Sequence, residues 1–181
     1  ILVAIVLLVV LAGALLTQWQ PPTPTLIPPD TLAFYDQLES LPSEKTVLLA
    51  VDFEPGLSGE MRFASTSVID HLMARNIPIA VVSTVPTGPA MADALIQKVR
   101  ENRADYDLAG KFVNLGYLPG GTISLVEFAR NPQGAAPQTV GGEYAWDKPV
   151  LSGIDDIQKF SSVIVITDSA ETGRDWVEQV Q

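Results

Sequence analysis

The sequence predicts an α/β fold: a three-layer domain of the Rossmann-like or flavodoxin-like type, with a mostly parallel sheet, preceded by one N-terminal transmembrane helix. Three observations lead to this prediction. Residues 1–16 carry no charged, hydroxyl or amide side chain. Four short apolar runs rich in β-branched residues recur later in the chain. Segments with helical spacing of apolar residues separate these runs, and this alternation is typical of parallel strands joined by crossover helices.

The apolar start, residues 1–19, is interpreted as a transmembrane helix. About 20 apolar residues in a helix cross a bilayer, and Trp19 stands where an interfacial aromatic residue is expected. A secretory signal peptide is one alternative, because Ala12-Gly13-Ala14 could supply a cleavage site. A buried helix of a soluble protein is another, but such a helix normally has a polar face. The length of the apolar run favours the transmembrane anchor.

The segment after the apolar run is free of basic residues. No Lys or Arg occurs from residue 17 to residue 43. Residues 20–29 contain five prolines, which favour a semi-rigid, extended linker. Because basic flanks mark the cytoplasmic side of a span, we expect a single-pass protein with its 30–181 domain on the extracytoplasmic side of a bacterial membrane. The chain begins without Met and stops within a predicted helix, so we expect the native protein to continue at both ends.

The first elements of the domain are a helix, a strand and a second helix. Asp30 can cap a short helix at 31–40. Residues 46–51 (TVLLAV) form a continuous apolar run, typical of a strand covered on both faces. Residues 58–75 have helical periodicity. The predicted apolar stripe of that helix consists of Met61, Ala64, Val68 and Leu72, with Ile69 and Met73 beside it.

The same alternation continues to the end of the chain. Residues 77–83 predict the second strand, and 87–102 the second helix, with Pro89 in its first turn. The inward positions of this helix are Met91, Leu95 and Val99. The remaining predicted elements are a strand at 111–117, a helix at 122–129, a long loop at 131–150, a short helix at 154–160, a strand at 162–167 and a helix at 170–181.

Composition excludes several classes of function. The 181 residues carry a formal net charge of −10, and a surface of this sign repels nucleic acid. The absence of cysteine removes disulfides, thiolate catalysis and thiolate metal sites. With a single histidine, His71, no cysteine and no G-x-S-x-G motif, Ser–His and Cys–His catalysis are nearly excluded. The first glycine-containing turn, EPGLSGE, also lacks the G-x-G-x-x-G fingerprint of dinucleotide binding.

Polar residues and glycines follow the predicted strands, where open α/β sheets bind ligands. These residues are Asp52, Glu54, Ser83, Thr84, Gly120, Gly121, Thr122 and Asp168. The carboxylates of Asp52, Glu54 and Asp168 could hold a hard divalent cation such as Mg²⁺. Ser83 or Thr84 could then contact a phosphate. The turn before Thr122 could present backbone amides to an anion at the start of a helix.

The more ordinary interpretation of these residues is structural, and we favour it. The set resembles the layout of haloacid-dehalogenase phosphatases, but their D-x-D start is D-F-E here and no Lys follows the third strand. Acidic residues beyond strands often cap helices, where the helix dipole favours negative charge. In the same way, Thr122 is expected to cap a plain turn.

Four segments resemble a known group of proteins. They are VLLAVDFEPGLSGEM, HLMARNIPIAVVSTVPTGPA, VNLGYLPGG and VIVITDSAETGRDWVEQV. Together they are similar to a group of uncharacterised bacterial membrane-anchored proteins, over most of residues 45–181. The resemblance implies the fold and the anchor and transfers no catalytic residue.

These observations lead us to expect a membrane-anchored, non-catalytic accessory or scaffolding subunit of a membrane complex. Its expected partners are membrane lipid and other membrane-protein subunits, and we predict no cofactor. The first alternative is a hydrolase or phosphatase that depends on Mg²⁺ bound by Asp52, Glu54 and Asp168. The second is a small-ligand-binding sensor domain that uses the same end of the sheet.

Overall fold

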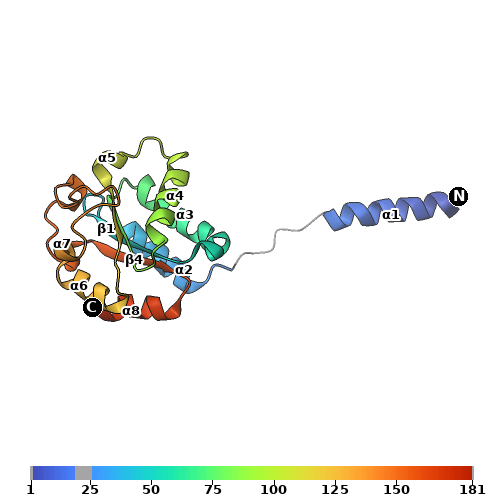
Figure 1. Ribbon diagram of the computed structural model, residues 1–181. Coiled ribbons are helices and arrows are strands. Elements are labelled where there is room, and N and C mark those ends of the chain that lie inside the picture. The colour runs from blue at the N-terminus through green and yellow to red at the C-terminus, as the bar shows by residue number, and fades with distance from the viewer. Residues whose placement is uncertain (1, 19–25, 181) are drawn as a thin grey trace. The chain divides into compact units, whose positions relative to one another are not determined.

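The structure is a computed structural model that describes residues 2–18 and 26–180 (Figure 1). The chain divides into two compact units, Ile1–Asp36 and Gln37–Gln181. The first contains helix α1 (Leu2–Gln18), which has no acidic or basic residue in its end turns. The predictions for Trp19 and for the linker up to residue 25 lie outside the described residues. Within the described residues, no helix has both the length and the apolar character needed to cross a membrane.

Helix α2 (Pro29–Ser40) matches the helix predicted at 31–40, with Asp30 in its first turn. Its Leu38 side chain is buried. The carbonyl groups of Leu38 and Leu41 both accept hydrogen bonds from the guanidinium group of Arg75. This contact ties the end of α2 to the end of the next long helix.

The second unit is built on an all-parallel sheet, which in the described residues has four strands in the order β3-β2-β1-β4. The strands are β1 (Val47–Asp52), β2 (Ile79–Ser83), β3 (Phe112–Tyr117) and β4 (Ser162–Thr167). The predicted parallel α/β sheet is therefore confirmed. The order 3-2-1-4 is that of the first four strands of the Rossmann arrangement, and it differs from the flavodoxin order 2-1-3-4-5.

Helices cover both faces of this sheet (Figure 1). Helices α3 (Ser58–Ala74) and α4 (Gly88–Arg100) pack on one face. Helices α6 (Thr122–Arg130) and α8 (Ala170–Val180) pack on the other. The shorter elements are η1 (Pro55–Leu57), α5 (Leu108–Lys111), α7 (Pro132–Ala135), η2 (Pro149–Leu151) and η3 (Ile157–Lys159). The helix predicted at 154–160 is thus only the 3-10 turn η3, and η1 and α5 were not predicted.

Strand β1 lies at the centre of the core. All six of its residues are buried. Leu49 and Val51 contribute to the cluster under α3 and α4, whereas Leu48 and Ala50 contribute to the cluster under α6 and α8. A strand that buries both faces needs apolar residues at every position, which is why its sequence is a continuous apolar run.

The predicted stripe of α3 is wrong at one position. Ala64 is exposed, and Ser65 takes the inward place with no exposed surface. The Ser65 hydroxyl donates to the Met61 carbonyl at 2.7 Å, so it is satisfied within the helix. Ile69 and Leu72 are fully buried as predicted. A serine at a buried helical position can thus satisfy its hydroxyl with a backbone carbonyl of its own helix, and hydropathy patterning does not detect this.

The stretch predicted as a long loop, 131–150, contributes to the second core. Ala145 and Val150 are buried there, beside the half-buried Trp146. The Trp146 indole N–H donates to the Ala136 carbonyl at 2.8 Å. The segment therefore works as a packed cover for the sheet, with α7 and η2 as its regular parts.

Gly88, the first residue of α4, sits against the ends of β1 and β2. A Cβ atom at this position would lie 1.9 Å from Ser83 Oγ and 2.3 Å from the Val51 carbonyl oxygen. We expect Gly88→Ala to lower the free energy of unfolding by about 3 kcal/mol, because backbone must move to make room. Urea unfolding followed by circular dichroism measures this change.

Gly59 offers a matched control in the first turn of α3. A Cβ atom at Gly59 would meet nothing within 4 Å. Gly59→Ala should leave stability unchanged or raise it by up to about 1 kcal/mol, because alanine is the better helix former. Equal urea midpoints for the two variants would contradict the close approach described for Gly88.

Candidate functional site

The carboxyl ends of β1 and β4 form the place where this topology normally binds ligands. These two strands are neighbours, with Asp52 opposite Thr167. The chain leaves β1 toward α3 on one face and leaves β4 toward α8 on the other. Strand order reverses between β1 and β4, and ligands of open α/β sheets bind outside such a switch point.

Asp52 ends β1 at this switch point and is 1% exposed. Its Oδ1 atom accepts hydrogen bonds from Ser83 Oγ at 2.8 Å and from the Thr84 backbone N–H at 2.7 Å. Its Oδ2 atom accepts from Thr84 Oγ1 at 2.8 Å and from the Trp176 indole N–H at 2.6 Å. We refer to Asp52, Ser83, Thr84 and Trp176 together as the Asp52 latch. It connects β1, the end of β2 and α8.

Ser83 and Thr84 turn inward in this arrangement. Ser83 has no exposed surface, and its Oγ atom also lies 2.7 Å from the Val51 carbonyl oxygen and accepts from the Val85 N–H at 3.0 Å. Thr84 is half-buried and gives both its hydroxyl and its backbone N–H to Asp52. Their donors are directed at the Asp52 carboxylate, and the phosphate contact suggested for them stays a prediction.

The other two predicted carboxylates lie on the surface. Glu54 is exposed, and its Oε2 atom lies 3.4 Å from Thr87 Oγ1. Asp168 is exposed as well. In the described part of the chain, no group of three or more acidic or histidine residues is placed to hold a metal ion. The Mg²⁺ site therefore stays a prediction.

The glycine turn before α6 has a conformation that only glycine adopts readily. Gly120 and Gly121 have φ angles of 119° and 60°. Gly121 is the N-cap residue of α6, so no side-chain hydrogen bond caps this helix. The interpretation of Thr122 as the cap is wrong, because its hydroxyl donates to Asp175 Oδ2 at 2.7 Å. Thr122 therefore connects α6 to α8, while glycine supplies the turn geometry.

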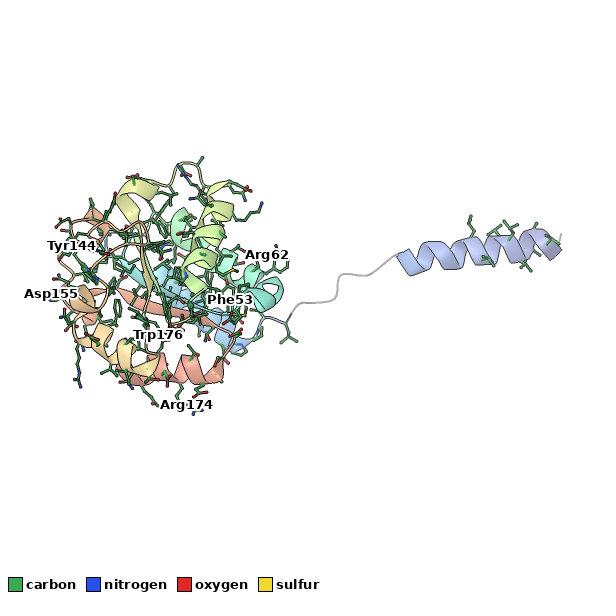
Figure 2. The ribbon with its side chains drawn as sticks, viewed as in Figure 1. Phe53, Arg62, Tyr144, Asp155, Arg174 and Trp176 are labelled. Carbon is green, nitrogen blue, oxygen red and sulfur yellow. The ribbon has the colours of Figure 1, made fainter. Side chains whose placement is uncertain are left out.

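Trp176 is the site residue that the sequence analysis missed. It is 1% exposed and belongs to the core under α6 and α8, while Phe53, which follows Asp52, belongs to the core on the opposite face (Figure 2). The sequence pointed to Trp176 only indirectly. A buried carboxylate at the end of β1 requires hydrogen-bond donors, and the indole N–H is the donor that an aromatic core residue can supply.

Comparisons with known proteins yield no match, whether to a protein family, to a curated protein or to a solved structure. The geometry of the site is therefore what indicates its chemistry. A carboxylate that accepts four internal hydrogen bonds loses some of them if it binds a cation. Each such bond to a charged group is worth about 1.5–3 kcal/mol. This arrangement suits a structural role for Asp52.

Proposed function

We propose that this chain is a membrane-attached, non-catalytic α/β domain that serves as an accessory or scaffolding subunit of a membrane protein complex. The observation that carries the proposal is the Asp52 latch. At the switch point, where enzymes of this topology place reacting groups, Asp52 is turned inward and joined to Trp176 by a 2.6 Å hydrogen bond. A domain that uses this position for its own cohesion is better suited to present surfaces than to perform chemistry.

The proposed attachment rests on α1. Its described side chains from Val3 to Leu11 are apolar and largely exposed, with exposed fractions from 55% for Val6 to 75% for Val3. Exposed apolar area costs about 25 cal/mol per Å² in water, and large contiguous apolar surfaces mark contacts with membranes or proteins. We therefore place α1 in lipid. The lack of basic residues from 17 to 43 supports an extracytoplasmic position for the acidic domain.

Flotation with lipid vesicles tests the attachment. The full chain is expected to float with zwitterionic vesicles through a density gradient. The double variant Leu8→Arg/Leu11→Arg should stay at the bottom, because each arginine costs about 2.5–3.5 kcal/mol in the centre of a membrane helix. Leu26→Arg is the control, since Leu26 is 93% exposed and lies outside α1; this variant should float.

The subunit role has its own readout. Extracted from its native membrane in a mild detergent, the chain is expected to migrate in a complex larger than its 19.4 kDa monomer. Native mass spectrometry of the extract gives the composition of that complex. A lone monomer would contradict the scaffolding role, and flotation of Leu8→Arg/Leu11→Arg would contradict the attachment.

A further inference from the structure

A groove between α3 and α4 combines an apolar hollow with a row of cations. The hollow has a volume of about 280 Å³ and is lined by Phe53, Met91, Ala94 and Leu95, together with Arg62 and Lys98. Arg62 and Lys98 also line a more open hollow of about 740 Å³ that continues along the two helices past Phe63 and Arg103. The two cations therefore stand where the hollows meet. Figure 2 labels Phe53 and Arg62 at this part of the domain.

The smaller hollow suits an aliphatic chain. Phe53 has no exposed surface and Leu95 is 5% exposed, so they form its floor, and the half-buried Met91 adds a flexible thioether. Each CH₂ group that leaves water for such a place is stabilised by the hydrophobic effect.

The cations at the junction are available to an anion. Among the side chains that the structure describes, Arg62 contacts only the Phe63 ring, at 6.0 Å, and has no acidic partner. Lys98 pairs with Glu101 at 2.6 Å, but both side chains are nearly two-thirds exposed, and such a pair contributes little. Arg103, by contrast, is engaged by Asp70 through two hydrogen bonds of 2.7 and 2.8 Å.

The cations of the groove contrast with the chain as a whole, which has 21 acidic and 11 basic residues. The two hollows bring together three cations, Arg62, Lys98 and Arg103. Asp70 pairs with Arg103 and Glu101 with Lys98, so Arg62 is the cation of this set that has no acidic partner among the described side chains. An anion that approaches this acidic domain is repelled by its net charge and can pair with Arg62 here. The charge therefore selects the chemistry of the occupant.

We propose that this groove binds an amphipathic anion, with an aliphatic chain in the hollow over Phe53 and Leu95 and a carboxylate or phosphate held by Arg62 and Lys98. Arginine holds both kinds of anion in bidentate geometry, and lysine adds a point charge. A free fatty acid and an acidic membrane lipid share this chemistry. The inference goes beyond the proposed accessory role, because neither subunit contacts nor membrane attachment requires a bound amphiphile.

Photolabelling of the full chain in zwitterionic nanodiscs tests the groove directly. The probe is dodecanoic acid with a diazirine on its chain, and labelled sites are mapped by mass spectrometry. Label is expected on the segments that carry Phe53 and Met91, and unlabelled dodecanoate should compete for them, whereas dodecanol should not. Absence of label on these two segments, or equal competition by dodecanol, would overturn the proposal.

Two groove variants and one matched control sharpen the result. Arg62→Gln/Lys98→Gln should reduce groove labelling at least about tenfold, since a charged hydrogen bond is worth more than 1.4 kcal/mol. Lys45→Gln/Lys159→Gln is the matched control, because these exposed cations line a different hollow, beside Pro78 and Pro149. Ala94→Phe should also reduce labelling, by filling the hollow from an exposed position. Unchanged labelling in Arg62→Gln/Lys98→Gln would overturn the proposal, and thermal melting confirms that each variant is folded.

A second arm distinguishes the two sources of the anion. Phosphatidic acid with a diazirine on one chain replaces the free acid, in the nanodisc itself. Groove labelling by either probe supports the amphipathic-anion site and names its source, and labelling by neither overturns it. Because the label is mapped to the groove, the result is separate from whether α1 enters lipid.

Discussion

Replacing Asp52 with alanine is expected to lower the free energy of unfolding by about 4 kcal/mol. The substitution removes the acceptor of four hydrogen bonds at a place where only 1% of the residue is exposed. The Ser83 hydroxyl can turn to the Val51 carbonyl, so three donors lose their acceptor. An unsatisfied buried donor costs about 1–3 kcal/mol, and local relaxation recovers part of the sum. The free energy of unfolding of Asp52→Asn should lie between those of the wild type and Asp52→Ala, because the amide oxygen still accepts hydrogen bonds while the NH₂ group faces other donors. Urea unfolding followed by circular dichroism measures both changes.

Asp168→Ala is the control for this experiment. Asp168 follows β4 as Asp52 ends β1, but it is exposed. Its substitution should change stability by no more than about 0.5 kcal/mol. If Asp52→Ala unfolded at the wild-type urea concentration, the carboxylate would not be structural, and the metal-dependent hydrolase would regain its main candidate ligand.

Trp176→Ala is expected to have an effect of similar size, about 3–5 kcal/mol, because it empties the largest fully buried side chain of the domain. Trp176→Phe keeps most of the ring volume and removes the N–H donor to Asp52, so it should cost about 1–2 kcal/mol. Urea unfolding followed by circular dichroism measures both stability changes, and intrinsic fluorescence reports the loss of the Trp176 indole.

A double-mutant cycle isolates the hydrogen bond itself. Asp52→Asn and Trp176→Phe should be non-additive by more than 0.5 kcal/mol, as expected for residues in one network. Val177→Ala, on the same helix but 56% exposed, should be additive with Asp52→Asn. Additivity of the first pair would mean that the short indole–carboxylate contact contributes no stability.

The elements of the fold were predictable because their signals are local. A continuous apolar run such as TVLLAV needs only six neighbouring residues to indicate a strand buried on both faces. The strand order was not predictable, because the pairing of Val47 with Ser162 depends on contacts between distant parts of the chain. The Ala64 error has a related cause: hydropathy ranks alanine above serine, whereas the buried Ser65 is satisfied by its own helix.

The grouping of Asp52, Ser83 and Thr84 at one edge of the sheet could be inferred from the sequence, because each directly ends or follows a strand. The hydrogen bonds between them show this contact, and their binding of a ligand stays a prediction. What Asp52 does depends on Trp176, which lies 124 residues later in the chain. No local pattern connects the two residues, so the inward orientation of the carboxylate could be seen only in three dimensions.

The long separation between β1 and its partners has a kinetic consequence. Strand β2 is synthesised soon after β1 and can pair with it. The strand on the other side of β1 begins only at Ser162, and the fourth donor to Asp52, the Trp176 indole, is synthesised later still. Folding that relies on such non-local pairing is slow, and domains form from the N-terminal end as the chain emerges. A nascent chain that has reached only β3 therefore has one unpaired edge on β1, a strand whose six residues are all buried in the finished fold. During synthesis, this domain passes through a period in which one edge of its central strand is unpaired, and such an edge is a template for aggregation.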